Sequence, residues 1–163
     1  MNIVIPVFFI SHWYASLFFQ TFFNHRYAAH RMFTMSKSWE KVFFILSYIF
    51  QGSSYLSPYT YGVLHRMHHA YADTPSDPHS PKYDGNIVKM MHKTKHIYHT
   101  IFTGGGRSWI PKKFFKDLPE WRSLDVFAHS WFSRIMIGTL YVMFYVYFVP
   151  PGQWYWYLLL PIH

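Results

Sequence analysis

The strongest chemical signal in the sequence is the pentapeptide HRMHH, which places imidazoles at His65, His68 and His69. On an α-helix, positions i, i+3 and i+4 lie on one face, so these three rings converge on one side of the helix. Imidazole nitrogens are good ligands for iron, zinc and copper. The triplet therefore predicts a metal site. The plainer alternative is a polar helix end whose histidines bind nothing.

A second pair of histidines, His25 and His30, occurs in the segment HRYAAH. At ~3.6 residues per turn, side chains five positions apart on an ideal α-helix point about 140° apart. One metal ion would not easily take both rings, so the spacing requires either a kink or two metal ions. The pair directly follows a long apolar segment, which favours a ligand role over two interfacial histidines beside arginines.

Several other catalytic and metal-binding patterns are missing from the sequence. The chain has no cysteine, which excludes disulfides, thiolate metal sites and cysteine nucleophiles. It also has no ExxH and no HExxH motif, which argues against a carboxylate-bridged di-iron bundle and against zincin proteases. An all-imidazole centre is left as the metal site that the sequence favours.

The distribution of charge indicates which elements hold these residues. Residues 1–25 and 135–163 carry no charged side chain, whereas 14 of the 15 Lys and Arg residues lie between Arg26 and Arg122. Uncharged, aromatic-rich ends around a basic middle are typical of a membrane protein with a cytoplasmic basic segment. We therefore predict an all-α fold with integral membrane helices and a helical, metal-binding cap at the cytoplasmic face.

The chain is expected to form a single domain, 1–163, because this length has room for one sizeable core. Residues 3–23 and 126–149 are each apolar and long enough for a transmembrane helix at ~1.5 Å per residue. The region between them, 24–125, is predicted to be cytoplasmic or interfacial and to carry the histidines. Residues 153–163 are predicted to start a further transmembrane helix, so the 163 residues are expected to belong to a longer protein.

The middle region contains two segments whose apolar pattern is not that of a simple span. The run 42–64 is interrupted by Gly52, Pro58 and several polar residues, which favours an in-plane or re-entrant element. Both histidine clusters then stay on one side of the membrane, as a shared metal centre requires. Residues 86–102 have the pattern of a basic amphipathic helix.

Together, NHRYAAHRMF and HRMHHAYADTPSDPHSP resemble the histidine boxes of the membrane fatty acid desaturases of the acyl-CoA (delta-9) type. The first box of that family is HxxxxH and the second is HRxHHxxxDxxxDPH. The second box is matched by His65, Arg66, His68, His69, Asp73, Asp77, Pro78 and His79. The resemblance implies that the metal ligands of a di-iron site are His25, His30, His65, His68 and His69. It also implies that Asp73 and Asp77 orient imidazole N–H groups or brace the loop.

The same resemblance implies an oxidoreductase that uses two iron ions and O2 to introduce a cis double bond into an acyl chain. The acyl chain would be linked to CoA, a carrier or a lipid, and electrons would come from a donor such as cytochrome b5 or ferredoxin. The basic region 82–122 would dock that donor, or would only reflect positive-inside topology. The family's third box, HxxHH, is missing, so these 163 residues alone are expected to be inactive.

Three other functions remain open from the sequence. A related membrane hydroxylase or ketolase shares the boxes but inserts oxygen. A non-enzymatic membrane haem or metal protein would also use paired histidines, although HRMHH has more of them than haem needs. A nucleic-acid-binding protein would fit the basic pI of about 9.6. The uncharged ends have no purpose there, so we expect no nucleic-acid partner.

The other histidines have plainer interpretations. His92, His96 and His99 share one helical face among lysines, which is typical of a solvated surface near lipid headgroups. His12 and His129 lie in apolar segments and are expected to be hydrogen-bonded packing residues. His79 is expected to brace its proline-rich loop.

Overall fold

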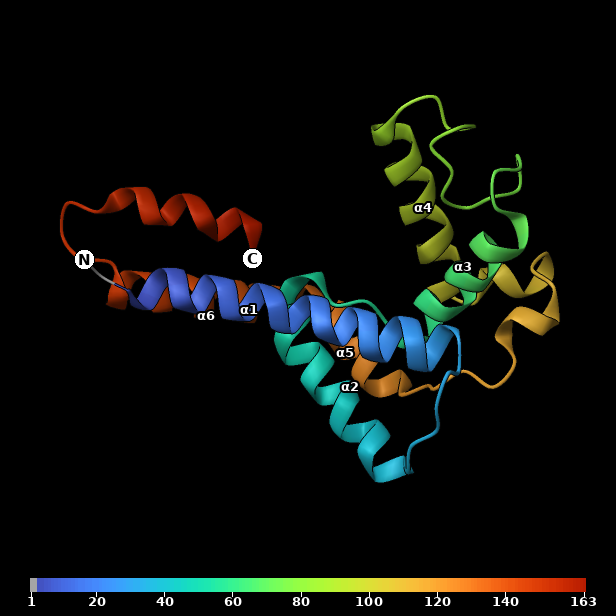
Figure 1. The fold of residues 1–163 in the computed structure, drawn as a ribbon, viewed down its shortest axis with the longest axis horizontal. Helices are drawn as coiled ribbons and strands as arrows, with labels where there is room; N and C mark the ends of the chain where they lie inside the picture. Colours follow the sequence, from blue (N-terminus) through green and yellow to red (C-terminus); the bar gives the residue numbers. More distant parts are fainter. Residues whose placement is uncertain (1–2) are drawn as a thin grey trace. The chain divides into compact units, whose positions relative to one another are not determined.

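The computed structural model describes residues 3–163, and within that range the chain forms helices and no strand (Figure 1). The predicted all-α fold class is therefore confirmed, while Met1 and Asn2 of the predicted domain lie outside the described residues. The chain divides into two compact units. Unit 1 consists of Met1–Phe23, Met35–Tyr55 and Trp121–His163, and unit 2 of Asn24–Thr34 and Leu56–Glu120.

Unit 1 is built from apolar helices whose aromatic rings interlock. Its main elements are α1 (Val4–Phe19), α2 (Lys37–Gln51), α5 (Arg122–His129), α6 (Trp131–Phe148) and the 3-10 helix η5 (Trp154–Ile162). Between α1 and α2, the rings of Phe19 and Phe50 stack with centroids 5.2 Å apart. The hydroxyls of Tyr48 and Ser133 lie 2.6 Å apart and link α2 to α6.

The apolar segments expected to cross a membrane are helical, with two changes in backbone. In the predicted span 126–149, the helix is interrupted at Ser130, whose hydroxyl accepts from the amide of Ser133 and starts α6. Among the described residues, α6 is the one helix long and apolar enough to cross a membrane by length and composition. In the predicted span 3–23, α1 covers 16 residues, or about 24 Å. The helix then continues as the π-helix η1 (Gln20–Ala29).

The predicted in-plane or re-entrant run 42–64 is divided between two helices. After α2 the chain makes a short 3-10 turn, η2 (Gly52–Ser54), and then enters α3 (Pro58–Tyr71). Gly52 has φ +55°, and a Cβ there would also collide with the Tyr141 hydroxyl, so glycine is required at this break. Helix α3 begins with Ser57 as N-cap and proline at its first position, which is a favoured start for a helix.

Unit 2 holds its helices around a small apolar core. Its elements are η1 from Asn24 onward, α3, α4 (Ile87–Phe102) and the 3-10 turns η3 (Gly105–Ser108) and η4 (Lys112–Phe115). The predicted helix 86–102 is present, and its cap is Asn86, whose side chain accepts from the Lys89 amide. The core that joins α3 to α4 and η4 consists of Val63, Met67, Ile101, Ile110 and Phe114. This packing fixes α3, the helix that carries HRMHH.

A buried hydrogen bond in unit 1 gives a direct test of its packing. The Tyr55 hydroxyl donates to Asp125 Oδ1 at 2.7 Å, and the two side chains are 2% and 1% exposed. We expect Tyr55→Phe to lower the free energy of unfolding by about 1–3 kcal/mol, because a buried carboxylate loses a donor. Unfolding in detergent, followed by circular dichroism, measures the change. Tyr155→Phe, at a half-exposed position, is the control, and equal stability of the two variants would contradict the assignment.

Candidate metal centre

The first histidine pair lies at the end of a π-helix, with His25 inside η1 and His30 directly after its last residue. This backbone removes the spacing problem of HRYAAH. In a π-helix the N–H of residue i+5 bonds the carbonyl of residue i, so residues five apart stack along the helix. The His30 amide donates to the His25 carbonyl at 3.0 Å. Their Nε2 atoms lie 3.1 Å apart. The expectation of a 140° separation was wrong here, because it assumed α-helical pitch.

Four of the five histidines predicted as ligands gather at one point in unit 2. His30 Nε2 lies 3.0 Å from His65 Nε2, which lies 2.9 Å from His69 Nε2. The ligand nitrogens of His25, His30, His65 and His69 all lie within 4.8 Å of one another. The two boxes, which are 35 residues apart, therefore present one cluster of imidazole nitrogens that can hold a metal ion.

The separations between these nitrogens constrain the geometry of a bound metal. Nitrogens bound ~2.1 Å from one metal lie ~3.0 Å apart when adjacent on a square or octahedron, and ~3.4 Å apart on a tetrahedron. The three short separations, 2.9–3.1 Å, fit adjacent positions on a square or octahedron. Structural zinc is tetrahedral, so these three separations fit a square or octahedral arrangement of nitrogens better than a tetrahedral one.

The electrostatics of the cluster favour neutral rings, which is the form that ligates metal. Burial, together with the neighbouring histidines, lowers the pKa of His65 to about 3. Burial also lowers the pKa of His25 and His30 below the ordinary value, with smaller effects of His69 on both. Each of these rings therefore keeps a lone pair available near neutral pH.

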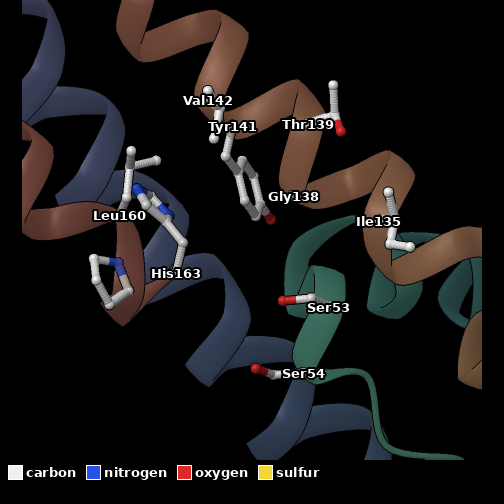
Figure 2. Close-up of a pocket in the computed structure, with 10 residues that line it drawn as sticks. Ser53, Ser54, Ile135, Gly138, Thr139, Tyr141, Val142, Leu160 and His163 are labelled. Carbon is white, nitrogen blue, oxygen red and sulfur yellow. The ribbon is translucent and has the colours of Figure 1, made fainter. Parts of the chain in front are cut away.

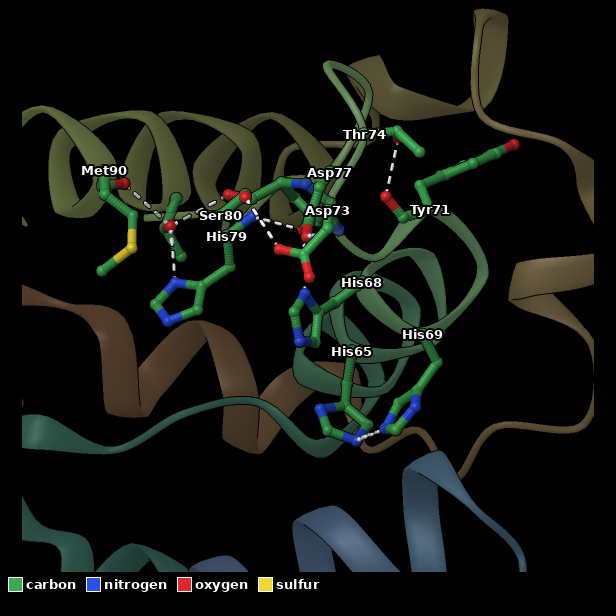
Figure 3. Close-up of polar contacts among 12 residues, drawn as sticks. His65, His68, His69, Tyr71, Asp73, Thr74, Asp77, His79, Ser80 and Met90 are labelled. Atoms are coloured by element: carbon green, nitrogen blue, oxygen red, sulfur yellow. Dashed lines mark hydrogen bonds and ion pairs between the residues drawn. The ribbon is translucent and has the colours of Figure 1, made fainter. Parts of the chain in front are cut away.

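His68 stands apart from the four-histidine cluster and has a different partner (Figure 3). Its Nδ1 lies 2.8 Å from Oδ1 of Asp77, a carboxylate with no exposed surface. Figure 3 shows the His68 ring between Asp77 and the pair His65 and His69. In the tautomer whose Nδ1–H donates to this carboxylate, Nε2 of His68 carries no hydrogen and is available as a ligand.

Asp77 is the organising residue of the loop that follows α3. Its carboxylate accepts the amides of Asp73 and His79 at 3.1 and 2.8 Å, in addition to the contact with His68. Burial by itself would raise the pKa of Asp77, but these hydrogen bonds lower it below its ordinary value. Asp73 contributes its backbone to this loop and makes a long contact from Ser80. Of the two predicted supporting carboxylates, Asp77 contacts a site histidine.

The loop is also fastened to α4, as expected for His79. The Nδ1 atom of His79 lies 3.0 Å from the Thr94 hydroxyl, which in turn donates to the Pro78 carbonyl. Lys93 donates to the Asp77 carbonyl at 2.8 Å and also pairs with Asp84. Helix α4 therefore supports the second box through polar contacts as well as through the core.

Sequence reasoning gave no role to two residues of the site, Tyr61 and Arg66. The Tyr61 ring stacks on His65 with centroids 5.4 Å apart and planes 11° apart. The sequence could have indicated this contact, because Tyr61 and His65 are four residues apart and such residues are neighbours on a helix. Arg66 donates hydrogen bonds to backbone carbonyls of both the first histidine segment and η4. Its acceptors are backbone atoms far away in sequence, so no local pattern indicates them.

Unit 1 contains a separate groove of about 660 Å³ (Figure 2). Figure 2 shows Tyr141 of α6 and His163, the residue after η5, on its wall, with Ser53 and Ser54 of η2 at one end. The predicted packing residue His12 lies nearby, with Nε2 2.8 Å from the Tyr141 hydroxyl. None of the predicted metal-site residues lines this groove.

The fold and site define a helical protein with an imidazole cluster that can bind metal, and comparison with known proteins adds one partial similarity. Over 72 residues, or 44% of the chain, it is 36% identical to the hex-5-enoyl-[acyl-carrier protein] acetylenase of Moorena producens (strain JHB). This match covers 22% of that enzyme's length. No family model and no solved structure matches the chain. The chain is thus similar, over part of its length, to an enzyme named for a hex-5-enoyl group on acyl-carrier protein.

Proposed function

We propose that the chain is part of a membrane fatty acid desaturase, an O2-dependent oxidoreductase with a di-iron centre. The observation that carries the proposal is the convergence of His25 and His30 with His65 and His69 within 4.8 Å. The partial similarity to an acyl-carrier-protein acetylenase supports action on an acyl chain. It also favours a carrier-protein thioester over acyl-CoA as the substrate.

In this function the chain's own residues supply an all-nitrogen set of donors. The four-histidine cluster would hold one iron ion, and His68, held by Asp77, would ligate the second. The bound iron pair would supply O2 activation and hydrogen removal from the acyl chain. The low pKa of His65, about 3, keeps that ring in its ligating form. Because His30 and His69 are exposed, ligands from elsewhere have access to the cluster.

The proposal includes a membrane location, with the histidine boxes on the cytoplasmic side. Large apolar side chains on the surface of α1 and α6 support it, with Trp13 61%, Ile135 63% and Val146 63% exposed. A soluble monomer rarely leaves large apolar patches uncovered. The electron donor would be a carrier such as cytochrome b5 or ferredoxin, and the positive charge of unit 2 would favour an acidic one.

The test is the complete protein supplied with acyl substrates, an electron donor and iron. We expect His68→Ala to reduce desaturation at least 100-fold and to lower the iron content, because its ring is a ligand. Mass spectrometry of the acyl products and elemental analysis measure the two effects. His92→Ala, on the exposed face of α4, is the control.

The outcomes of this test also separate the competing functions. New carbon–carbon unsaturation in the products supports a desaturase, whereas hydroxylated or keto products indicate the related oxygen-inserting enzymes. A Soret band in the purified protein would indicate haem and contradict the proposal. Full activity and full iron content in His68→Ala would remove His68 from the site.

A further inference from the structure

Arg66 lies within HRMHH, but its side chain leaves the histidine face and contacts two other segments of unit 2. Its Nε donates to the Ala29 carbonyl at 2.7 Å and its Nη2 to the Ala28 carbonyl at 3.3 Å. Its Nη1 donates to the Lys116 carbonyl at 2.7 Å and to the Phe114 carbonyl at 3.4 Å. One half-buried guanidinium therefore has four backbone acceptors.

These acceptors are carbonyls at helix ends. Ala28 and Ala29 are the last residues of η1, and Phe114 lies in the last turn of η4. Carbonyls in a last turn have no partner within their own helix. A positive charge at this end of a helix is also stabilising, because the helix dipole makes the C-terminus partially negative. The planar fork of arginine reaches several acceptors at once, which a lysine ammonium on a flexible stem does not do.

The chain geometry just beyond these carbonyls is unusual on both sides. Arg31 has φ +54° and Asp117 has φ +56°, a region that non-glycine residues rarely adopt. The two residues form an ion pair with a distance of 2.8 Å. The ion pair thus joins the residues at which the chain turns after η1 and after η4. Arg66 donates to carbonyls next to both turns.

The connection to the histidines is direct. Ala29 precedes His30, and Arg66 follows His65. The Nε2 atoms of these two histidines are 3.0 Å apart and form the link between the first and the second box. The hydrogen bond from Arg66 to the Ala29 carbonyl therefore joins the chain segments that carry His65 and His30.

We propose that Arg66 is a positioning residue that fastens the π-helical first box against α3, so that His25 and His30 stay in register with His65 and His69. The inference deepens the proposed function and rests on it for the identity of the site as a metal centre. The hydrogen bonds of Arg66 go to backbone carbonyls. Its effect on metal affinity passes through the placement of His30.

The first experiment measures the fastening without metal. Amide hydrogen exchange of the metal-free full chain is followed in Arg66→Lys, Arg66→Gln and Arg107→Lys, the last being an exposed arginine of η3. We expect exchange in segments 25–32 and 112–117 to rise at least tenfold in both Arg66 variants and to be unchanged in Arg107→Lys. Unchanged exchange in folded Arg66→Lys overturns the proposal. Should Arg66→Gln fail to fold, Arg66→Lys keeps the charge and decides.

The second experiment measures metal affinity with Co²⁺ as a spectroscopic probe. We expect Arg66→Lys to weaken Co²⁺ binding roughly 10-fold, the size typical of a residue that supports ligands. In a His30→Ala background the same change should have almost no further effect, because coupled residues are non-additive. Equal losses in both backgrounds would show that Arg66 does not act through His30 and would overturn the proposal.

The two experiments keep the failure of the proposed function separate from the failure of this inference. A wild-type chain that binds no Co²⁺ or Fe²⁺ would defeat the metal assignment, while hydrogen exchange would still decide whether Arg66 fastens the segment. Wild-type metal binding with unaltered affinity in Arg66→Lys would leave the metal assignment intact and overturn the role of Arg66.

Discussion

Replacing His65 by alanine is expected to weaken binding of Fe²⁺ or Co²⁺ to the chain by roughly 10²–10³-fold. Structural zinc sites with four ligands bind with ~10–16 kcal/mol in total, which is about 3–4 kcal/mol for each ligand. His65 is the central ring of the cluster, with Nε2 atoms of His30 and His69 at 3.0 and 2.9 Å. Its loss removes one donor and also separates the two boxes. Titration of the purified chain, read by cobalt absorption, measures the affinity.

The control for this change is another histidine of unit 2. His96→Ala alters an exposed ring on α4 and should leave the affinity unchanged, since His96 is outside the cluster. Helix content should persist in His65→Ala, because the ring is half-buried and the core beneath α3 is formed by other residues such as Val63 and Met67. Wild-type affinity in folded His65→Ala would exclude the cluster as the metal site.

The second large effect is expected for Asp77→Asn. The carboxylate is fully buried and accepts from three groups, the His68 ring and the amides of Asp73 and His79. Asparagine offers one acceptor oxygen and turns an NH2 group toward a donor, which leaves a buried group unpaired. We expect a loss of about 2–4 kcal/mol in the free energy of unfolding, from hydrogen bonds to a charged group and from that unpaired donor.

The same substitution should also change the proton on His68. An amide NH2 facing Nδ1 favours the tautomer with its proton on Nε2, so the ring loses its outward lone pair. Metal affinity at the position served by His68 should fall roughly 10–100-fold. Nitrogen-15 chemical shifts of the imidazole report the tautomer directly.

Asp73→Asn is the matched comparison within the same loop. Asp73 has φ +54°, which asparagine tolerates well, and its bond to Asp77 comes from its backbone amide. A small effect on stability and metal affinity is expected. Equal effects of the two substitutions would contradict the central role of Asp77.

The parts of this structure that the sequence predicted are those governed by local rules. The amphipathic helix predicted over 86–102 is observed as α4, Ile87–Phe102. Of the three rings of HRMHH that were predicted to converge, His65 and His69 meet through their Nε2 atoms, whereas His68 contacts Asp77. The two boxes were expected to share one metal centre because both carry histidines. The observed cluster contains two histidines from each box, His25 and His30 with His65 and His69.

The parts that escaped prediction depend on backbone choice and on contacts distant in sequence. In the π-helix at His25 the backbone hydrogen bonds join residues five apart, whereas in an α-helix they join residues four apart. The residue types in this segment do not select between the two. His68 contacts Asp77 rather than Asp73 because of the way the loop folds back on α3. Both aspartates are close to His68 in sequence, so spacing alone does not select between them. The Arg66 contacts span 37 to 50 residues of sequence.

The π-helix also gives the four residues between His25 and His30 a role beyond spacing. With four residues between them, the two histidines are five positions apart, which is the interval of the π-helical hydrogen bond from the His30 amide to the His25 carbonyl. The spacing of the first box therefore fits a π-helical backbone as well as a pair of ligands. A chain with one residue fewer there would have the ring spacing natural to an α-helix and would need no widened turn. The interval between two ligands can thus record which kind of helix lies beneath them.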